Sequence, residues 1–152
     1  PQSVRDSFLK GKWEMTDEGP EVWRRSVYTY WKRGLRYPMF EVLDQPNMNI
    51  SCESRTTTTV PTQALGMLNS RFLNEQAGIF ADRLQREAPD ALSRQIERAI
   101  RLTSGRQATP DEVQKDTEFV NDLKEHEQLS SEHALRMYCL MMLNANEFVY
   151  LD

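Results

Sequence analysis

Two groups of polar side chains in this chain could contact a ligand or a substrate. One group surrounds an aromatic-rich stretch in the first sixty residues, and the other directly follows a strongly apolar stretch near the end. Guanidinium groups bind carboxylates and phosphates through paired hydrogen bonds, and amides and carboxylates provide the acceptors and donors of a polar ligand site. The candidate binding residues are Arg24, Arg25, Asp44, Arg55, Asn144, Asn146 and Glu147.

Catalysis by a nucleophile or by an acid–base pair is not indicated. The two histidines, His126 and His133, have no Ser or Cys partner by pattern. The chain has no glycine-rich phosphate loop and no metal-ligand spacing. Acidic side chains in one helical segment read as a solvated face and not as a catalytic pair. These acidic residues are Asp111, Glu112, Asp116 and Glu118.

Four further residues are assigned structural roles. Cys52 and Cys139 are either small buried residues or the two ends of a disulfide that closes a loop of more than eighty residues. Spacing does not decide between these alternatives. Gln63 is expected to make hydrogen bonds at the start of a helix, and Asn69 is one of two candidates to cap the next helix.

A basic and aromatic stretch runs from Val22 to Tyr37 without an acidic residue. Interleaved cations and flat rings could bind a polyanion such as a sulfated or uronic polysaccharide, or single-stranded nucleic acid. Alternatively, the aromatics are core and the arginines pair with acidic residues of the second half. Residues 61–152 carry ten basic against fifteen acidic side chains, so they offer such partners, and the second interpretation is favoured.

The second half of the chain predicts a helical bundle of five segments. Apolar residues recur at helical spacing from Pro61 onward. Asn69 or Ser70, Asp90, Thr109 with Glu112, and Ser130 or Ser131 are placed as helix starts, and Gly105 as a helix end. The run from Ala134 to Leu143 is apolar almost all round, so it is expected at the centre of the bundle.

The first half of the chain lacks this rhythm. Ser26 to Trp31 fits a strand or a helix equally well, Met39 to Leu43 fits a short helical turn, and Asn47 to Thr59 reads as extended chain. The fold class expected is therefore mainly α, with an aromatic-rich, partly extended section (1–60) packed against the bundle (61–152) as one domain.

Composition excludes several classes of protein. The chain has 152 residues, a net charge of −4 and 28% charged residues, which disfavours general binding to nucleic acid. The longest apolar stretch, Tyr138 to Leu143, is far shorter than the roughly 20 residues of a membrane span. The chain opens at Pro1, so it is expected to be a fragment of something longer.

Motifs at both ends of the chain resemble one family. They are Arg24-Arg25-Ser26-Val27-Tyr28-Thr29-Tyr30-Trp31, then Pro38, Asp44, Cys52, Arg55 and Pro61-Thr62-Gln63-Ala64-Leu65, and finally Leu143-Asn144-Ala145-Asn146-Glu147-Phe148. In order and spacing these resemble the C-terminal domain of unknown function of large planctomycete proteins that carry a cytochrome-c-like domain. The resemblance runs from about Trp13 to Asp152.

The resemblance implies a setting but no reaction. It implies an exported, extracytoplasmic, multidomain protein linked to redox or polysaccharide metabolism. This chain would be its structural or interaction module, with the upstream domains of the same polypeptide as partner. It would hold no cofactor itself, and haem c would belong to an upstream domain. The alternative is that the chain contributes residues to a catalytic or polysaccharide-binding site completed by those domains.

The arginines of the first half give one specific expectation. A buried guanidinium without acceptors is costly, so at least one of Arg24, Arg25 and Arg55 is expected to make a bidentate contact with Asp44 or Glu147. Such a contact would join the first section to the C-terminal motif.

Overall fold

The computed structural model describes residues 25–29, 40, 43 and 61–149. The chain divides into two compact units, Pro1–Gln63 and Ala64–Asp152. In the first unit a short 3-10 helix, η1 (Ser26–Tyr28), follows Arg25, and Phe40 is helical. The sequence left strand and helix open at Ser26, and the structure has a helical turn there. The predictions for Asn47 to Thr59, and for most of the aromatic section, lie outside the described residues.

The described part of the chain is helical and contains no strand, which confirms the predicted mainly α fold class. Residues 61–149 form six α-helices. They are α3 (Pro61–Leu68), α4 (Arg71–Glu87), α5 (Leu92–Ser104), α6 (Pro110–His126), α7 (Ser131–Met142) and α8 (Asn146–Val149). Five of them match the predicted segments. The short helix α8, which lies in the C-terminal motif, was not predicted.

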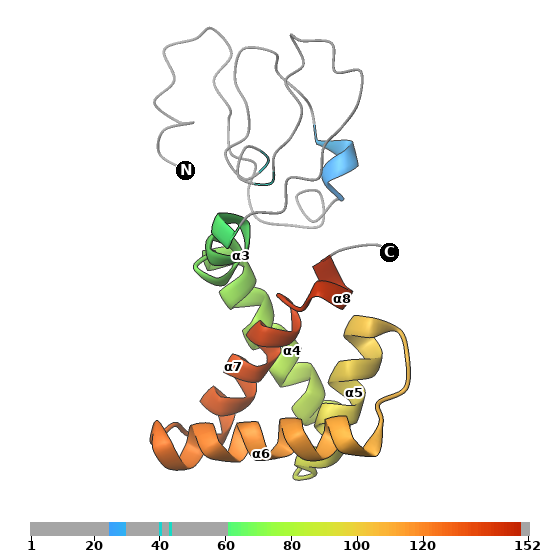
Figure 1. Cartoon of the computed structure of the whole chain (residues 1–152), viewed down its shortest axis with the longest axis vertical. Coiled ribbons are helices and arrows are strands. Elements are labelled where there is room, and N and C mark those ends of the chain that lie inside the picture. Colours follow the sequence, from blue (N-terminus) through green and yellow to red (C-terminus); the bar gives the residue numbers. More distant parts are fainter. Residues whose placement is uncertain (1–24, 30–39, 41–42, 44–60, 150–152) are drawn as a thin grey trace, which may run out of the picture. The chain divides into compact units, whose positions relative to one another are not determined.

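The core of the second unit is built by α4, α5, α6 and α7. In Figure 1, α7 lies beside α4, and α6 crosses α5 and α7. The α4 stripe follows the predicted spacing, because Leu73, Ala77 and Leu84 are buried. Phe72, placed on the same stripe by sequence, is 53% exposed, since it lies on the flank of that face.

Helix α7 contributes the most buried residues, in agreement with its expected central position. Ala134, Leu135, Tyr138, Cys139 and Leu140 are buried. However, the helix is not enclosed on all sides, because Met137 and Met141 are 45% and 40% exposed. The apolar run is longer than the face that α4 and α6 cover, so its methionines lie at the edge.

One predicted helix cap differs in the structure, and a second choice, between Asn69 and Ser70, is decided by it. Ala91 is the N-cap of α5, whereas Asp90 has a φ of 57° and lies before it in a tight turn. Asp tolerates this left-handed backbone better than most residues do, which allows the chain to reverse between α4 and α5. Ser70 is the N-cap of α4, and the Asn69 side-chain amide instead donates to the Leu65 carbonyl (2.9 Å), closing α3.

The remaining predicted helix ends are confirmed. Gly105 ends α5 with a φ of 74°. Thr109 and Glu112 form the reciprocal hydrogen bonds of a capping box at the start of α6. The Ser130 hydroxyl accepts from the His133 N–H at the start of α7.

Candidate functional site

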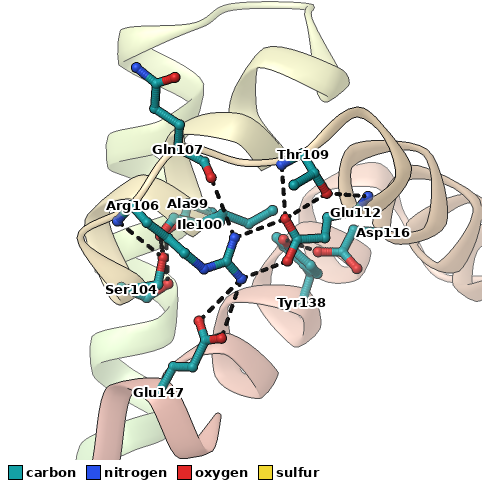
Figure 2. Close-up of polar contacts among 11 residues, drawn as sticks. Ala99, Ile100, Ser104, Arg106, Gln107, Thr109, Glu112, Asp116, Tyr138 and Glu147 are labelled. Atoms are coloured by element: carbon teal, nitrogen blue, oxygen red, sulfur yellow. Dashed lines mark hydrogen bonds and ion pairs between the residues drawn. The ribbon is translucent and has the colours of Figure 1, made fainter. Parts of the chain in front are cut away.

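The polar C-terminal motif lies beside the connection between α5 and α6. Gly105 turns the chain out of α5, and the capping box fixes the first turn of α6, so Arg106 is held between these two helix ends. Helix α8 brings Glu147 to the same place (Figure 2). Arg106, Thr109, Glu112 and Glu147 are named here the Arg106 cluster.

Arg106 is the centre of this cluster. Its two terminal nitrogens donate to Glu112 Oε2 (2.9 Å) and Oε1 (2.6 Å), which is a bidentate pair. One of them also donates to both Glu147 oxygens at 3.3 Å, and the other to the Gln107 carbonyl at 3.3 Å. Figure 2 shows the guanidinium group between the two carboxylates. The cation thereby ties α8 to the start of α6.

The cluster changes the acidity of Glu112. Hydrogen bonds from Arg106, followed by those from the Thr109 backbone and hydroxyl, lower the Glu112 pKa from 4.5 to about 2. The hydrogen bonds to Glu112, followed by those to Glu147, raise the Arg106 pKa above its ordinary value. Both groups are therefore fully ionised near neutral pH, and neither is suited to exchange a proton there.

A second polar contact lies next to the cluster. The Tyr138 hydroxyl of α7 donates to Asp116 Oδ2 of α6 at 2.7 Å (Figure 2). Burial, and next this hydrogen bond, raise the pKa of Tyr138 above its ordinary value. The interpretation of Asp116 as part of a solvated face was therefore wrong: it is half-buried because the α6 face toward α7 includes it.

The Asn144 side chain makes a hydrogen bond at the C-terminal end of α7. Its amide nitrogen donates to the Leu140 carbonyl at 2.7 Å, as a helix-end role requires. Its Oδ1 atom is buried without a hydrogen-bond donor in the described part of the chain. Asn146 starts α8, is exposed, and makes no side-chain hydrogen bond within the described residues.

The remaining candidates of the sequence analysis are only partly described. Arg25 is exposed, and its carbonyl accepts from the Tyr28 N–H at 2.9 Å. Gln63 is 7% exposed in the first turn of α3. Arg24, Asp44, Cys52 and Arg55 lie outside the described residues. The predicted bidentate pairing of an arginine of the first half therefore stays a prediction, although Glu147 is paired with Arg106.

Cys139 is a free, fully buried thiol, so the disulfide alternative is absent from this structure. Burial raises its pKa to about 12, which makes it a poor nucleophile at neutral pH. Among the described residues, no three His, Cys, Asp or Glu side chains are grouped as a metal site would require. Within the same residues, no helix has both the length and the apolar character to cross a membrane.

Sequence reasoning missed a second charged region, on α5. Arg94, Arg98 and Arg101 line a hollow of about 440 Å³ between one face of α5, the end of α4 and the α5–α6 loop. Their spacing of four and three residues places all three on one helix face, which the sequence alone could have revealed.

Comparison with known proteins gives a family but no activity. The family model of PSD1, a protein of unknown function (DUF1553), matches residues 2–120. The chain belongs to this family. The match covers the first unit and α3 to α5, and it ends within α6. No curated protein and no solved structure matches the chain.

Proposed function

We propose that this PSD1 chain is a structural and interaction module of a larger exported protein, with no reaction of its own. The observation that carries the proposal is that side chains of the C-terminal motif make contacts within the helical unit itself. Glu147 is bound to Arg106, and Asn144 is bound to the end of α7. Side chains engaged in these internal contacts hold helices together, whereas those of a reactive site would converge on an open cleft.

Exposed apolar side chains support the interaction role. Phe72 and Ile79 on α4 are 53% and 57% exposed, and Met137 and Met141 on α7 are also exposed. Aromatic residues and methionine are enriched where proteins bind one another. The proposed partner is the upstream part of the same polypeptide, and the setting is extracytoplasmic and linked to redox or polysaccharide metabolism. Haem c, where the full protein has it, belongs to an upstream domain.

The test separates a structural role of Glu147 from a role in a site. If the C-terminal motif is structural, Glu147→Gln lowers the melting temperature of the chain. Below that temperature, its association with the upstream portion of the protein is unchanged. Asn146→Ala is the matched control, because Asn146 is exposed and makes no side-chain hydrogen bond in the described part of the chain. It should leave the melting temperature unchanged.

Association is measured by calorimetry between the 152-residue chain and the separately expressed upstream portion of the protein. We expect a saturable complex with both the wild-type chain and the Glu147→Gln variant. Absence of a complex would contradict the interaction role. Loss of association in Glu147→Gln without a change in melting temperature would favour a ligand site at the motif.

A further inference from the structure

The three arginines of α5 form a face that internal contacts do not neutralise. Among the described residues, Arg98 alone of the three has an acidic partner, Glu87, at 2.6 Å, and it shares that carboxylate with Arg83 at 2.7 Å. Arg94 and Arg101 are exposed and make no ion pair within the described residues. The hollow therefore has two guanidinium groups at its wall that no described carboxylate neutralises.

Glu97 is the one carboxylate on this wall that is not held by an arginine. It makes no ion pair in the described part of the chain, and it lines two hollows at once. The second hollow is bordered by Ser93, Pro110, Val113, Gln114, Thr117 and Glu118, and no basic residue lines it. Glu97 thus lies on the divide between a basic and an acidic hollow. The three arginines that line the basic hollow exceed Glu87 and Glu97 by one positive charge, and Arg83, which pairs with Glu87 from outside the lining, raises the local excess to two.

The chemistry of the wall selects a ligand class. Guanidinium groups bind carboxylates and other oxyanions through two parallel hydrogen bonds, so the wall fits an anionic ligand. No aromatic side chain lines this hollow, so it offers no stacking surface for nucleic-acid bases. Ala88 and Ala108 also line the hollow, and their small side chains leave room for a ligand.

The spacing of the arginines also selects the form of the ligand. With a rise of about 1.5 Å per residue, Arg98 and Arg101 lie about 6 and 10.5 Å along the helix axis from Arg94. Carboxylates at positions i, i+4 and i+7 of a second helix repeat these intervals. Alternate residues of an extended strand are about 6.6 Å apart. They therefore match the distance of about 6 Å from Arg94 to Arg98 but not the distance of about 10.5 Å from Arg94 to Arg101.

We propose that the arginine face of α5 binds an acidic helical peptide segment with carboxylates at i, i+4 and i+7. The proposal rests on the role of the chain as an interaction module and names the partner chemistry that this role requires. The segment would lie along α5, with its carboxylates on Arg94 and Arg101 and on the free side of Arg98.

The experiment uses the full 152-residue chain and two fluorescent peptides. One is a helical peptide with glutamates at i, i+4 and i+7, and the other has the same composition with the glutamates scrambled. We expect the chain to bind the ordered peptide more tightly and the affinity to fall with salt, because the contacts are exposed charge pairs. Equal affinity for both peptides would overturn the proposal.

Variants locate the site. In Arg94→Gln/Arg101→Gln, affinity for the ordered peptide should fall about tenfold, as expected for the loss of two exposed ion pairs. The control is Arg86→Gln/Lys115→Gln, which removes the same charge at positions that do not line the hollow. Circular dichroism verifies that both variants fold. An equal loss in the control would overturn the proposal, because it would show an effect of net charge alone.

Two further measurements distinguish the peptide site from a saccharide site and from the interaction role proposed for the whole chain. Binding of a sulfated polysaccharide in place of the peptide would assign the face to a saccharide and overturn the peptide site. The Arg94→Gln/Arg101→Gln variant is also tested against the upstream portion of the protein. If the wild-type chain binds that portion and the variant binds it equally well, the interaction role stands and the arginine face is not its site.

Discussion

A single guanidinium group connects three secondary-structure boundaries in this protein. Arg106 follows the end of α5, pairs with the first turn of α6 and reaches α8 through Glu147. The group and both of its carboxylate partners are partly exposed to solvent, so its role is to fix geometry and not to supply a large stabilisation. The C-terminal motif, which contains Glu147, is thereby tied to a residue 41 positions earlier in the chain.

The acidity of Glu112 gives a test of this cluster. Its pKa is about 2 in the folded chain and near 4.5 ordinarily, so its contribution to stability is present above about pH 4.5 and is lost as pH falls toward 2. In Arg106→Gln the Glu112 pKa should rise toward its ordinary value, and acid unfolding should depend less on pH in this window. Carboxyl NMR titration measures the pKa. Arg86→Gln is the control, and an unchanged Glu112 pKa in Arg106→Gln would contradict the assignment.

Tyr138 and Asp116 form the other contact that a single substitution can test. Tyr138→Phe should destabilise the chain by about 1–3 kcal/mol, because the half-buried Asp116 carboxylate loses its donor. A double-mutant cycle with Asp116→Asn, followed by denaturant unfolding, measures the coupling between the two side chains. Met137→Leu, an exposed neighbour on α7, should change stability by less than about 0.5 kcal/mol. A coupling of zero would show that the hydrogen bond contributes nothing.

At the scale of the elements, two glycines have opposite roles. Gly105 ends α5 with a φ of 74°, and a Cβ there would meet no atom, so Gly105→Ala should cost about 1 kcal/mol through backbone strain alone. Gly78 lies inside α4, where a Cβ would make an ordinary contact at 3.7 Å with Arg136 Nε. Gly78→Ala should therefore stabilise the chain by about 0.5–1 kcal/mol.

Thermal unfolding of the two alanine variants measures both effects against one wild-type reference. Destabilisation by Gly78→Ala would mean that α4 and α7 approach more closely than the structure shows. A neutral Gly105→Ala would mean that the end of α5 can adopt another conformation.

The helix ends and the buried helix faces were predictable where residue type and spacing alone determine them. The capping box at Thr109, the stop at Gly105 and the stripe on α4 follow from residue type and periodicity, and the structure confirms them. Asp90 was misplaced because its residue type suits a cap as well as a left-handed turn. Helix α8 was missed because four residues carry no periodicity, and tertiary contacts to α5 form it instead.

The polar site was less predictable than the helices. The sequence marked Glu147 and Glu112 but not the cation between them, because Arg106 lies 41 residues from Glu147 and no local pattern links the two. Asp116 looked exposed because its charged neighbours on α6 are exposed. In contrast, the arginine face of α5 follows from spacing alone and was open to prediction.

At the scale of the whole molecule, the core of the second unit predicts where the chain can be cut. The buried apolar residues all belong to α4, α5, α6 and α7 among the described residues. A chain of residues 61–152 should therefore fold alone, with a helical circular dichroism spectrum and cooperative unfolding. A chain of residues 61–120, which stops where the family match ends, lacks α7 and should show neither.

Both truncated chains are compared by circular dichroism and urea unfolding at the same concentration. Cooperative unfolding of residues 61–120 would mean that α7 is dispensable for the core. Failure of residues 61–152 to fold would mean that the helical unit depends on the first sixty residues.

The pairing of α4 with α7 has a consequence for synthesis on the ribosome. The apolar face of α4 is complete once Glu87 has been added, but the helix that covers it starts only at Ser131. At about 5–20 residues per second, translation of the intervening chain takes on the order of seconds, whereas helices form in about a microsecond. Nascent chains that have not yet reached Ser131 therefore present an uncovered apolar face, and they are the form of this protein that chaperones should bind most strongly.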